Sequence, residues 1–401
     1  MFLCAKALMV SIVVAGAAFP AVVAAASAAS GAGQARRPVI AYVANGGSDT
    51  VTPINTATNR AGRAIRVRGG PVAIAITPNG KTAYVVNNAG SVSAIRTATN
   101  KVVKVIGVGK APRAIAITPD GKTVYVANTD NGNGSTVTAI RTANNKVEKT
   151  IRVGRDPEAI AITPNGKTAY VANVQGSSVT PIRVATNTAG KAIKVGDRPI
   201  AIAITPDGRT AYVSDQGSGV TPIRVATNTA GKTIKVPDAG NTIVITPDGR
   251  TAYVLCGAAV TPIRVLGNVK LKPIKVSGEA DAMALTPNGK MLYVTAFTDA
   301  SFGPVIPIQT ATNKAGKAIS GAIGSVAIAI TPDSKTAYVV GLGGSVRPIR
   351  IATGTALRLI RTGIEPDAIA ITPAGRHLRW HQRRQSIRRS GLVLRRGDHL
   401  Q

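Results

Sequence analysis

The sequence predicts an all-β protein built from repeated four-stranded antiparallel sheets, and three observations lead to this class. All eight tyrosines recur in one sequence context, at intervals of 40 to 45 residues. Apolar residues make up 44% of the 401 residues but aromatic residues only 3%, so the core must consist mainly of Ala, Val and Ile, which suit pleated sheets. Turn sequences divide each repeat into short runs. A repeat of this length is typical of a propeller or a solenoid.

Each repeat contains four runs, which we label A to D in chain order. Residues 199–236 show the pattern, PIAIAITPDGRTAYVSDQGSGVTPIRVATNTAGKTIKV, in which run A (AIAIT) is apolar throughout, as expected of a strand buried on both faces. A Thr-Pro-Asp-Gly or Thr-Pro-Asn-Gly turn follows, since proline fixes φ at the first corner and glycine supplies the positive φ that ends the hairpin. Run B (TAYVAN or a variant), run C (SVTPIR or a variant), an Ala-Thr-Asn turn and run D (AGKAIKV or a variant) complete one antiparallel sheet.

The number of runs predicts how the repeats close. Residues 39–69 supply only runs B, C and D, and residues 367–372 supply only run A. Joining these ends would complete an eighth sheet and remove exposed sheet edges, which predicts a closed β-propeller of eight blades over residues 38–373, with the N- and C-terminal strands sharing a blade. A ring of seven blades is the alternative, and a parallel β-helix is disfavoured because its coils are shorter. The seven complete sets occupy residues 71–111, 112–156, 157–198, 199–239, 240–279, 280–324 and 325–365.

Proline recurs inside run C, where an interior strand should donate a backbone hydrogen bond. Either this run carries a local bulge, or the residue faces a gap in the ladder, and the sequence leaves both open. The prolines are Pro53, Pro181, Pro222, Pro262, Pro307 and Pro348.

Run B carries a family resemblance. It reads YVAN at 42–45, 125–128 and 170–173 and YVVN at 84–87, and it recurs in order with the Pro-Asp-Gly turn and the Ala-Thr-Asn turn across the repeats. In these motifs the chain resembles the YVTN family of bacterial and archaeal cell-surface β-propellers. The resemblance implies an exported or surface-layer propeller, usually of seven blades, with a binding or structural role.

The N-terminal residues read as an export signal. An apolar run from Ala7 to Phe19 is followed by small residues that suit cleavage after Ala28. We therefore expect residues 1–28 to be a signal peptide and residues 29–37 a linker, with the protein secreted to the cell surface or the extracellular space. The alternative is a retained membrane anchor, because the apolar stretch is just long enough to span a bilayer.

The repeats lack the residues that many enzymes use for catalysis or metal binding. All three histidines and the only tryptophan lie at or beyond His377, so the ring offers no imidazole for general base work or for haem ligation. Cys4 lies in the leader, so the mature chain keeps one cysteine, Cys256, and both a disulfide framework and a cysteine-ligated zinc site are excluded. The sequence therefore predicts a protein that is not an enzyme, with no cofactor and no metal.

Carboxylates are the remaining candidates for a site. In a propeller the B–C loops and the D–A connections share one face, and twelve of the eighteen acidic residues map to it. Binding usually resides in such loops on a rigid scaffold. We interpret these carboxylates as solvated loop residues, with a shared ligand or metal site or a lactonase-like hydrolase as the alternatives. The candidate ligand-face residues are Asp156, Glu158, Asp197, Asp238, Asp281, Glu365 and Asp367.

The cations that produce the net charge of +31 also follow the repeat. One set follows the A–B turn, a second ends run C and a third lies in run D, which predicts a cationic belt around the rim and the face opposite the acidic loops. We expect a monomer that binds an anionic cell-wall polymer or a surface protein with salt-sensitive affinity, with solubility by charge as the alternative. Nucleic acid is disfavoured because export separates the protein from it and the ring exposes few aromatic residues for stacking.

The last residues break the repeat. Where a new run B is due, residues 374–401 contain eight Arg and no Lys, Thr or Tyr. This change in composition predicts either a frameshifted end or a true basic tail that binds anions. Reading the other two frames of the coding DNA for a continued repeat distinguishes the two.

Overall fold

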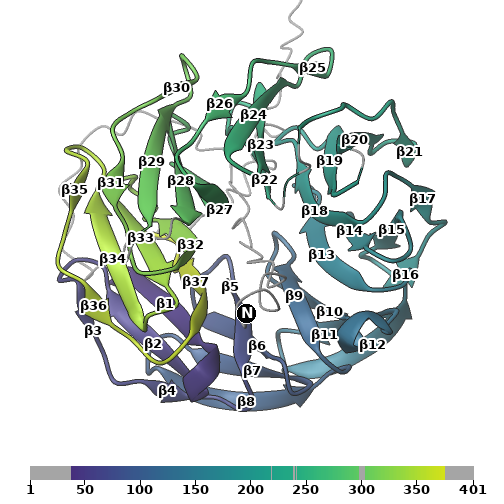
Figure 1. Cartoon of the computed structure of the whole chain (residues 1–401). Coiled ribbons are helices and arrows are strands. Elements are labelled where there is room, and N and C mark those ends of the chain that lie inside the picture. The colour runs from purple at the N-terminus through teal and green to yellow at the C-terminus, as the bar shows by residue number, and fades with distance from the viewer. Residues whose placement is uncertain (1–37, 218, 238–239, 241, 298–302, 375–401) are drawn as a thin grey trace, which may run out of the picture.

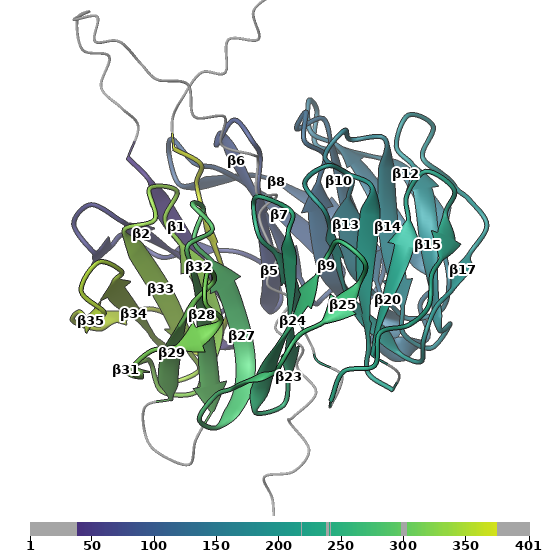
Figure 2. The ribbon, with the colours of Figure 1, turned by 90° about the horizontal axis from the view of Figure 1, so that it is seen from above.

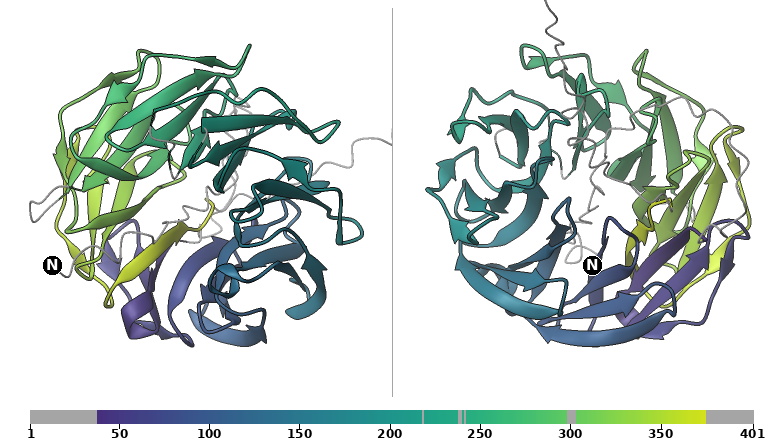
Figure 3. Two further views of the ribbon diagram at one scale, coloured as in Figure 1. Left: turned by 45° about the vertical axis from the view of Figure 1, so that its right-hand side comes forward. Right: turned by 180° about the vertical axis from the view of Figure 1, so that it is seen from behind.

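The computed structural model describes residues 38–374 except 218, 238–239, 241 and 298–302. These residues form eight antiparallel sheets that stand side by side in a ring (Figure 1), and Figures 2 and 3 show the ring from other sides. The predicted eight-bladed propeller is confirmed, and the seven-bladed alternative is wrong. The expected signal peptide and linker, the basic tail from residue 375 and the candidate Asp238 lie outside the described residues.

Each blade has four strand positions, from A on the inside to D on the outside, and we number the blades 1 to 8 from the first complete repeat. The A strands are β5 (Pro71–Ile76), β9 (Pro112–Ile117), β13 (Pro157–Ile162), β18 (Pro199–Ile204), β22 (Ile243–Ile245), β27 (Glu279–Leu285), β32 (Ser325–Ile330) and β37 (Pro366–Ile371). The B strands are β6 (Thr82–Asn87), β10 (Thr123–Asn128), β14 (Thr168–Asn173), β19 (Thr210–Asp215), β23 (Thr251–Cys256), β28 (Met291–Phe297), β33 (Thr336–Gly341) and β1 (Ile40–Asn45).

The outer half of each blade follows the same order. The C strands are β7 (Ser91–Arg96), β11 (Thr136–Arg141), β15 (Ser178–Arg183), β20 (Gly219–Arg224), β24 (Ala259–Arg264), β29 (Pro304–Gln309), β34 (Ser345–Arg350) and β2 (Thr50–Asn55). The D position holds β8 (Lys101–Gly107), β12 (Lys146–Arg152), β16 (Thr188–Ala189) with β17 (Ile193–Lys194), β21 (Thr229–Ala230), β25 (Val269–Lys270) with β26 (Ile274–Lys275), β30 (Lys314–Ala315) with β31 (Ile319–Ser320), β35 (Thr355–Ala356) with β36 (Ile360–Arg361), and β3 (Arg60–Ala61) with β4 (Ile65–Arg66). Two 3-10 turns, η1 (Gly46–Ser48) and η2 (Asp130–Gly132), lie in B–C loops, and no helix among the described residues is long enough to cross a membrane.

The two ends of the described chain close the ring by sharing blade 8 (purple and yellow in Figure 1). β37 pairs with β1 in an antiparallel ladder that starts with Ala41 opposite Ile371, and β1 pairs in turn with β2. The backbone N–H of Thr372 donates to the carbonyl of Ile40 at 2.9 Å, which extends the ladder by one step. The predicted sharing of a blade by the terminal strands is confirmed.

The hydrophobic core lies between the blades. Eight clusters of buried side chains each join two neighbouring blades around the ring. In β1, for example, Tyr42 packs against Ile74 and Val85 of blade 1, whereas Val43 packs against Tyr338 of blade 7. Successive side chains of a strand point to opposite faces, so each blade buries both faces, and this explains why run A is apolar throughout.

A hydrogen bond between blades explains why tyrosine recurs. The hydroxyl of Tyr42 donates to Oδ1 of Asn100 in the next blade, with 2.6 Å between the oxygen atoms. Asn100 ends the Ala-Thr-Asn turn with a φ of 52°, a left-handed conformation that asparagine adopts more readily than most residues. We call this contact the tyrosine–asparagine clasp. It recurs at 2.5 to 2.7 Å in Tyr84–Asn145, Tyr125–Asn187, Tyr170–Asn228, Tyr212–Asn268, Tyr253–Asn313 and Tyr338–Asn59.

The prolines of the C strands face a gap in the outer ladder. In blades 1 and 2, where Ala94 and Ala139 stand in place of proline, the D strands β8 and β12 are continuous. In the six blades with proline, the D strand is shortened or split into pieces, since proline has no N–H to donate. The carbonyl of Pro181 still accepts a hydrogen bond from the N–H of Gly190 at 2.7 Å. The gap is therefore the correct one of the two predicted explanations.

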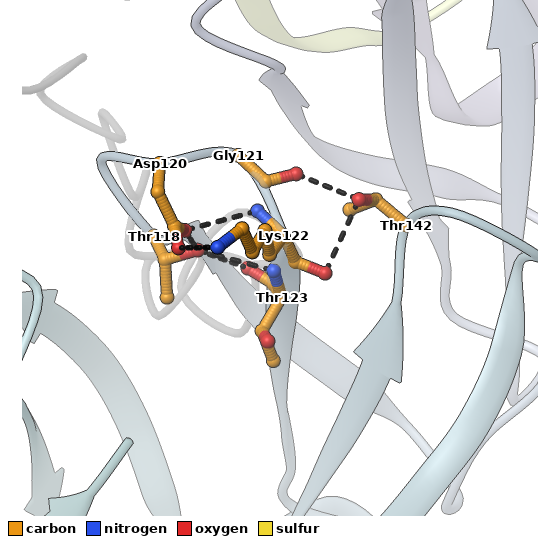
Figure 4. Close-up of polar contacts among 6 residues, drawn as sticks. All are labelled: Thr118, Asp120, Gly121, Lys122, Thr123 and Thr142. Carbon is orange, nitrogen blue, oxygen red and sulfur yellow. Dashed lines mark hydrogen bonds and ion pairs between the residues drawn. The ribbon is translucent and has the colours of Figure 1, made fainter. Parts of the chain in front are cut away.

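The A–B turns are held by their own side chains (Figure 4). Thr118 Oγ1 donates to Oδ1 of Asp120 at 2.6 Å, and the backbone N–H of Lys122 donates to the same oxygen at 3.0 Å. Gly121 has a φ of 71°, and a Cβ added to it would lie 3.2 Å from Cδ of Pro78 in the preceding blade. Glycine is therefore required here both by the backbone conformation and by the packing of neighbouring turns.

One clasp lacks its acceptor. The turn of blade 7 that corresponds to the others carries Gly354, with a φ of 61°, where the other turns carry asparagine, so Tyr293 has no such partner. We predict that Gly354→Asn raises the free energy of unfolding by about 0.5 to 1 kcal/mol through a new hydrogen bond. Denaturation in urea measures the change.

Two controls accompany this substitution. Gly354→Ala adds a side chain without an acceptor at positive φ and should destabilise the protein by about 1 kcal/mol. Asn187→Gly removes the acceptor of Tyr125 and should destabilise it by about 1 to 3 kcal/mol, because a buried hydroxyl is left without a partner. If Gly354→Asn and Gly354→Ala are equally destabilising, the clasp does not contribute as we describe.

The correlation between proline and the outer ladder can also be tested. We predict that Ala94→Pro interrupts β8 without unfolding the blade, because six other blades accommodate proline there. The backbone amide of Lys104, which is opposite Ala94, should then exchange with solvent at least about tenfold faster, since its local ladder is lost. The amide of Val103 corresponds to that of Gly190 and should keep its bond to the carbonyl of residue 94. Hydrogen exchange measures this, with β12 of the next blade as the internal control, and unchanged protection of β8 would contradict the explanation.

Candidate functional site

The connections between strands form two faces. The B–C loops lie against the D–A connections, since the N–H of Val174 donates to the carbonyl of Asp156 at 2.8 Å, and we call this the loop face. The A–B turns lie against the C–D turns, since the N–H of Thr142 donates to the carbonyl of Lys122 at 2.9 Å, and we call this the turn face (Figure 4). The candidate carboxylates from the sequence analysis belong to the connections of the loop face. The cations that follow the A–B turns and end the C strands belong to the turn face.

At the loop face, most inner strands begin with a bulge. In blade 3, Pro157 is opposite Asn173 and Ala159 is opposite Ala172, so Glu158 is an extra residue in the ladder. A bulge of this kind re-aims the side chain of the extra residue. Four of the seven extra residues are ionisable, although the inner strands are otherwise apolar. The other extra residues are Val72, Arg113, Ile200, Asp281, Val326 and Asp367.

Three of the predicted candidates therefore lie in strands and not in loops. Glu158, Asp281 and Asp367 belong to β13, β27 and β37. The sequence pattern places all three in the D–A connections, although it also assigns Asp367 to run A. The bulge instead makes each charged residue part of the inner strand. The prediction also missed Arg113, which holds the same position in β9. The signal was present in the repeats, since charged and apolar residues alternate at this one position between nearly constant neighbours.

Arg113 and Glu158 lie on neighbouring blades and form an ion pair, with 4.0 Å between Nε and Oε1. Asp156, in the connection that leads into β13, is 8% exposed and lies within the electrostatic influence of Arg113. Burial raises the pKa of both carboxyl groups, and the positive charge of Arg113 opposes that rise. The structure thus brings two predicted candidates, Asp156 and Glu158, together around Arg113.

Asp281 lies on blade 6, apart from this cluster, and Asp367 lies on blade 8. Burial raises the pKa of each to about 6, with a further rise from Glu279 beside Asp281 and from Glu365 beside Asp367. Arg113 opposes the rise at Asp367, so the two residues act on each other electrostatically. These carboxyl groups lose their protons closer to neutral pH than an exposed aspartate does.

The remaining candidates are exposed side chains in D–A connections. The carbonyl of Asp197 accepts a hydrogen bond from the N–H of Gly217 at 3.3 Å, and the carbonyl of Glu365 accepts one from the N–H of Gly46 at 2.8 Å. Their backbone thus joins the D–A connections to the B–C loops, while their carboxylates face solvent. The structure does not bring these two together with the cluster around Arg113.

Asp215 is a buried carboxyl group that the candidate set did not include. It ends β19 at the position where β14 has Asn173, and it is fully buried. Thr221 Oγ1 donates to its Oδ2 at 2.5 Å, in the place where Asn173 Nδ2 donates to Thr180 Oγ1 at 2.9 Å. Burial raises the pKa of Asp215 to about 7, so its protonated form is an analogue of the asparagine side chain. The signal in the sequence was the change from YVAN to YVSD.

The described residues of the loop face can hold a polar ligand or move a proton. No group of three or more His, Cys, Asp or Glu among residues that the structure describes could hold a metal ion. Carboxyl groups with a pKa of about 6 to 7 can bind or release a proton near neutral pH. Arg113 adds a fixed positive charge that can orient an oxygen atom of a ligand.

The turn face carries exposed cations in pairs. Lys122 precedes Thr123, which is opposite Arg141 at the end of the C strand, so the two cations lie on adjacent strands. The same register repeats in six blades, so that a cation just before the B strand and a cation at the end of the C strand lie near the same end of the blade, and we call these two residues a cation pair. The cation pairs are Lys81–Arg96, Lys122–Arg141, Lys167–Arg183, Arg209–Arg224, Arg250–Arg264 and Lys335–Arg350.

Carboxylates offset part of this charge in some blades. Asp120 lies 3.5 Å from Nζ of Lys122, and both side chains are more than half exposed. In blades 1 and 3 the turn carries Asn79 or Asn165 in place of aspartate. The cation pairs of those two blades therefore have no turn carboxylate beside them.

Comparison with known proteins supports the fold alone. Kuenenia stuttgartiensis hydrazine synthase is 23% identical with a TM-score of 0.56, over 74% of this chain and 96% of that chain. The dihydro-heme d1 dehydrogenase NirN in complex with DHE is 17% identical with a TM-score of 0.68, over 82% and 74%. A functionally unknown protein from Desulfotomaculum acetoxidans DSM 771 is 18% identical with a TM-score of 0.60, over 84% and 99%. No family model and no curated protein matches, so membership of the YVTN family is not confirmed.

These similarities correct one prediction. The chain was predicted not to be an enzyme because its ring contains no histidine, but two of the similar structures are a synthase and a dehydrogenase by name. Propellers of this shape thus occur in enzymes, and the lack of histidine in the ring does not exclude catalysis. At this level of identity the likeness transfers no activity to this chain.

The raised pKa of Asp215 predicts a pH dependence of stability. The folded protein holds this proton up to about pH 7, whereas the unfolded chain releases it near pH 4, so the contribution is complete below pH 4 and is lost as the pH rises to 7. The loss amounts to at most about 4 kcal/mol for a shift of this size. Asp215→Asn should remove this dependence and stabilise the protein at pH 8, as measured by urea denaturation from pH 4 to 8. An unchanged pH profile would contradict the assignment, and Asp207→Asn at an exposed turn is the control.

Proposed function

We propose that the protein is an exported β-propeller that binds an anionic polymer of the cell envelope through its turn face. The observation that carries the proposal is the repetition of exposed cation pairs in six blades of one rigid ring. One exposed ion pair contributes little, but a polyanion can contact several cation pairs at once, and linked contacts raise the overall affinity. Export rests on the N-terminal signal that the sequence predicts.

The distribution of the other cations supports this proposal. Among the Lys and Arg residues that the structure describes, all are exposed except Arg113 and Arg347. Arg347 has a structural role, since its Nε donates to the carbonyl of Gly321 at 3.1 Å and its Nη1 donates to the carbonyl of Leu357 at 2.9 Å. Nearly all of the positive charge of the ring is therefore available to an anionic partner.

The experiment compares two sets of four neutral substitutions. Lys81→Gln, Arg96→Gln, Lys167→Gln and Arg183→Gln remove the two cation pairs without turn carboxylates. The control set, Arg68→Gln, Lys110→Gln, Arg155→Gln and Arg198→Gln, removes the same charge from the loop-face side. We expect the first set to weaken binding to purified anionic wall polymer about tenfold or more and the control set about twofold or less, since screening confines each charge to its neighbourhood.

Binding should also fall as salt is added, because the contacts are electrostatic. A sedimentation assay with wall fractions at low and high salt measures both effects. If the two sets of substitutions weaken polymer binding equally, the affinity for the polymer depends on net charge alone and not on the turn face. Binding that does not change with salt would remove the electrostatic mechanism altogether.

A second candidate function is hydrolysis of a lactone or a related ester by loop-face carboxylates. The observation that favours it is the grouping of Asp156 and Glu158 around Arg113, where burial raises the pKa of both carboxyl groups and the cation can orient a carbonyl oxygen. Turnover of a lactone panel that is lost in Asp156→Asn would support this function. Absence of turnover by the unmodified protein, at pH 5 to 8, would remove it.

A further inference from the structure

The loop face carries apolar side chains on blades 6, 7 and 8. Ile323, Leu342 and Ile364 are 44%, 47% and 64% exposed. Ile323 lies in the D–A connection that leads into blade 7, Leu342 in the B–C loop of blade 7, and Ile364 in the connection that leads into blade 8. Single exposed apolar residues are ordinary, but a group of them marks an interaction site.

Backbone contacts bring these three loops together. The N–H of Leu342 donates to the carbonyl of Gly324 at 3.0 Å, and the N–H of Thr362 donates to the carbonyl of Gly344 at 2.9 Å. A Cβ added to Gly324 would lie 3.4 Å from Cβ of Leu342, so the two loops are in van der Waals contact. We call Ile323, Leu342 and Ile364 the apolar patch. Phe297, which ends β28 on the loop face of blade 6, is 52% exposed.

The surroundings of the apolar patch are acidic. Glu365 follows Ile364 directly, Asp367 lies two residues further on, and Glu279 is opposite Phe297 in the ladder of blade 6. Arg68, in the connection that leaves blade 8, borders this region. No Lys or Arg occurs in the described B–C loops of blades 6 to 8 or in the described connections that lead into these blades. These segments are 276–281, 303–304, 321–325, 341–345, 362–367 and 45–50.

The other half of the loop face has the opposite character. The connections that lead into blades 2, 3 and 4 carry the exposed cations Lys110, Arg155 and Arg198. A protein with 49 Lys and Arg thus keeps one sector of one face free of them among its described loops, and that sector holds the apolar patch. The two properties together define the chemistry of a partner.

We propose that the apolar patch binds a segment of a partner protein that presents apolar side chains flanked by Lys or Arg. Burial of the apolar side chains supplies the affinity, and the carboxylates select the sign of the flanking charge. The net positive charge of the ring does not oppose this contact strongly, because charges more than about 8 Å away are screened at physiological ionic strength. Elsewhere in the described ring, the exposed large apolar residues are Leu266 and Val269 at the C–D turn of blade 5, and Val103, Val105 and Val147 in β8 and β12. A second copy therefore offers one small apolar site beside cations at its turn face, and its binding is a separate outcome of the test.

The experiment uses the full-length protein and a synthetic twelve-residue peptide of Leu and Lys as the probe. A peptide of the same pattern, with Glu in place of Lys, is the control probe. Leu342→Ser and Ile364→Ser together should weaken binding of the Leu/Lys peptide about tenfold or more, since truncated apolar contacts at the centre of an interface carry much of its affinity. Leu266→Ser, at an 85% exposed residue on the turn face, is the control and should leave binding unchanged. Fluorescence anisotropy measures the dissociation constants.

Several results would overturn the proposal. Equal binding by the wild-type protein and the doubly substituted protein, or equal binding of the Leu/Glu peptide, would show that the patch does not select a basic partner. Self-association of the wild type that Ile364→Ser abolishes in sedimentation would assign the patch to a second copy. Tighter binding of a peptide with the sequence of residues 375–401, lost with Ile364→Ser, would assign it to this chain's own tail. Unchanged thermal melting of each variant confirms that the substitutions at exposed positions leave the fold intact.

Discussion

A buried tyrosine hydroxyl has to find a hydrogen-bond partner, and in this ring the partner belongs to the next blade. Seven tyrosines donate to an asparagine at the C–D turn of their neighbour, so the polar contact that anchors each interface also fixes how far one blade is rotated against the next. The side chains around each tyrosine are mostly Ala, Val and Ile, which fill the space between two sheets without directional bonds. The eight interfaces are near-copies, and a ring of near-identical steps closes on itself.

With the blades fixed in this way, the two faces are free to differ. Loops and bulges at one face display carboxylates, Arg113 and the apolar patch, whereas the turns at the other face display the cation pairs. The bulges matter because they introduce charged residues into the otherwise apolar inner strands without disturbing the pairing of the residues that follow. Binding at one face therefore needs no change in the packing that supports the other. The two proposals, an anionic polymer at the turn face and a basic segment at the loop face, are therefore compatible in one molecule.

Much of the fold could be predicted because each blade repeats the same local signals. The spacing of Tyr42 and its counterparts set the period, and the turn sequences set the strand boundaries, which made the shared eighth blade a matter of counting. The site could be predicted only in part. Glu158, Asp281 and Asp367 were recognised as candidates but placed in loops, because a charged residue before an apolar run is as typical of a connection as of a bulge. Arg113 was missed because it holds the same bulge position in β9, and the apolar patch was missed because its side chains come from three separate loops.

The way in which the ring closes has a mechanical consequence. β1 begins and β37 ends at the turn-face end of blade 8, and the two strands are antiparallel neighbours. A force that pulled the two ends apart would therefore load the hydrogen bonds of this ladder one after another, from Ala41 opposite Ile371 inwards, and never all together. Tethering through both ends would make blade 8 the weakest point of the protein under tension, whereas tethering through one end would leave the same ladder unloaded.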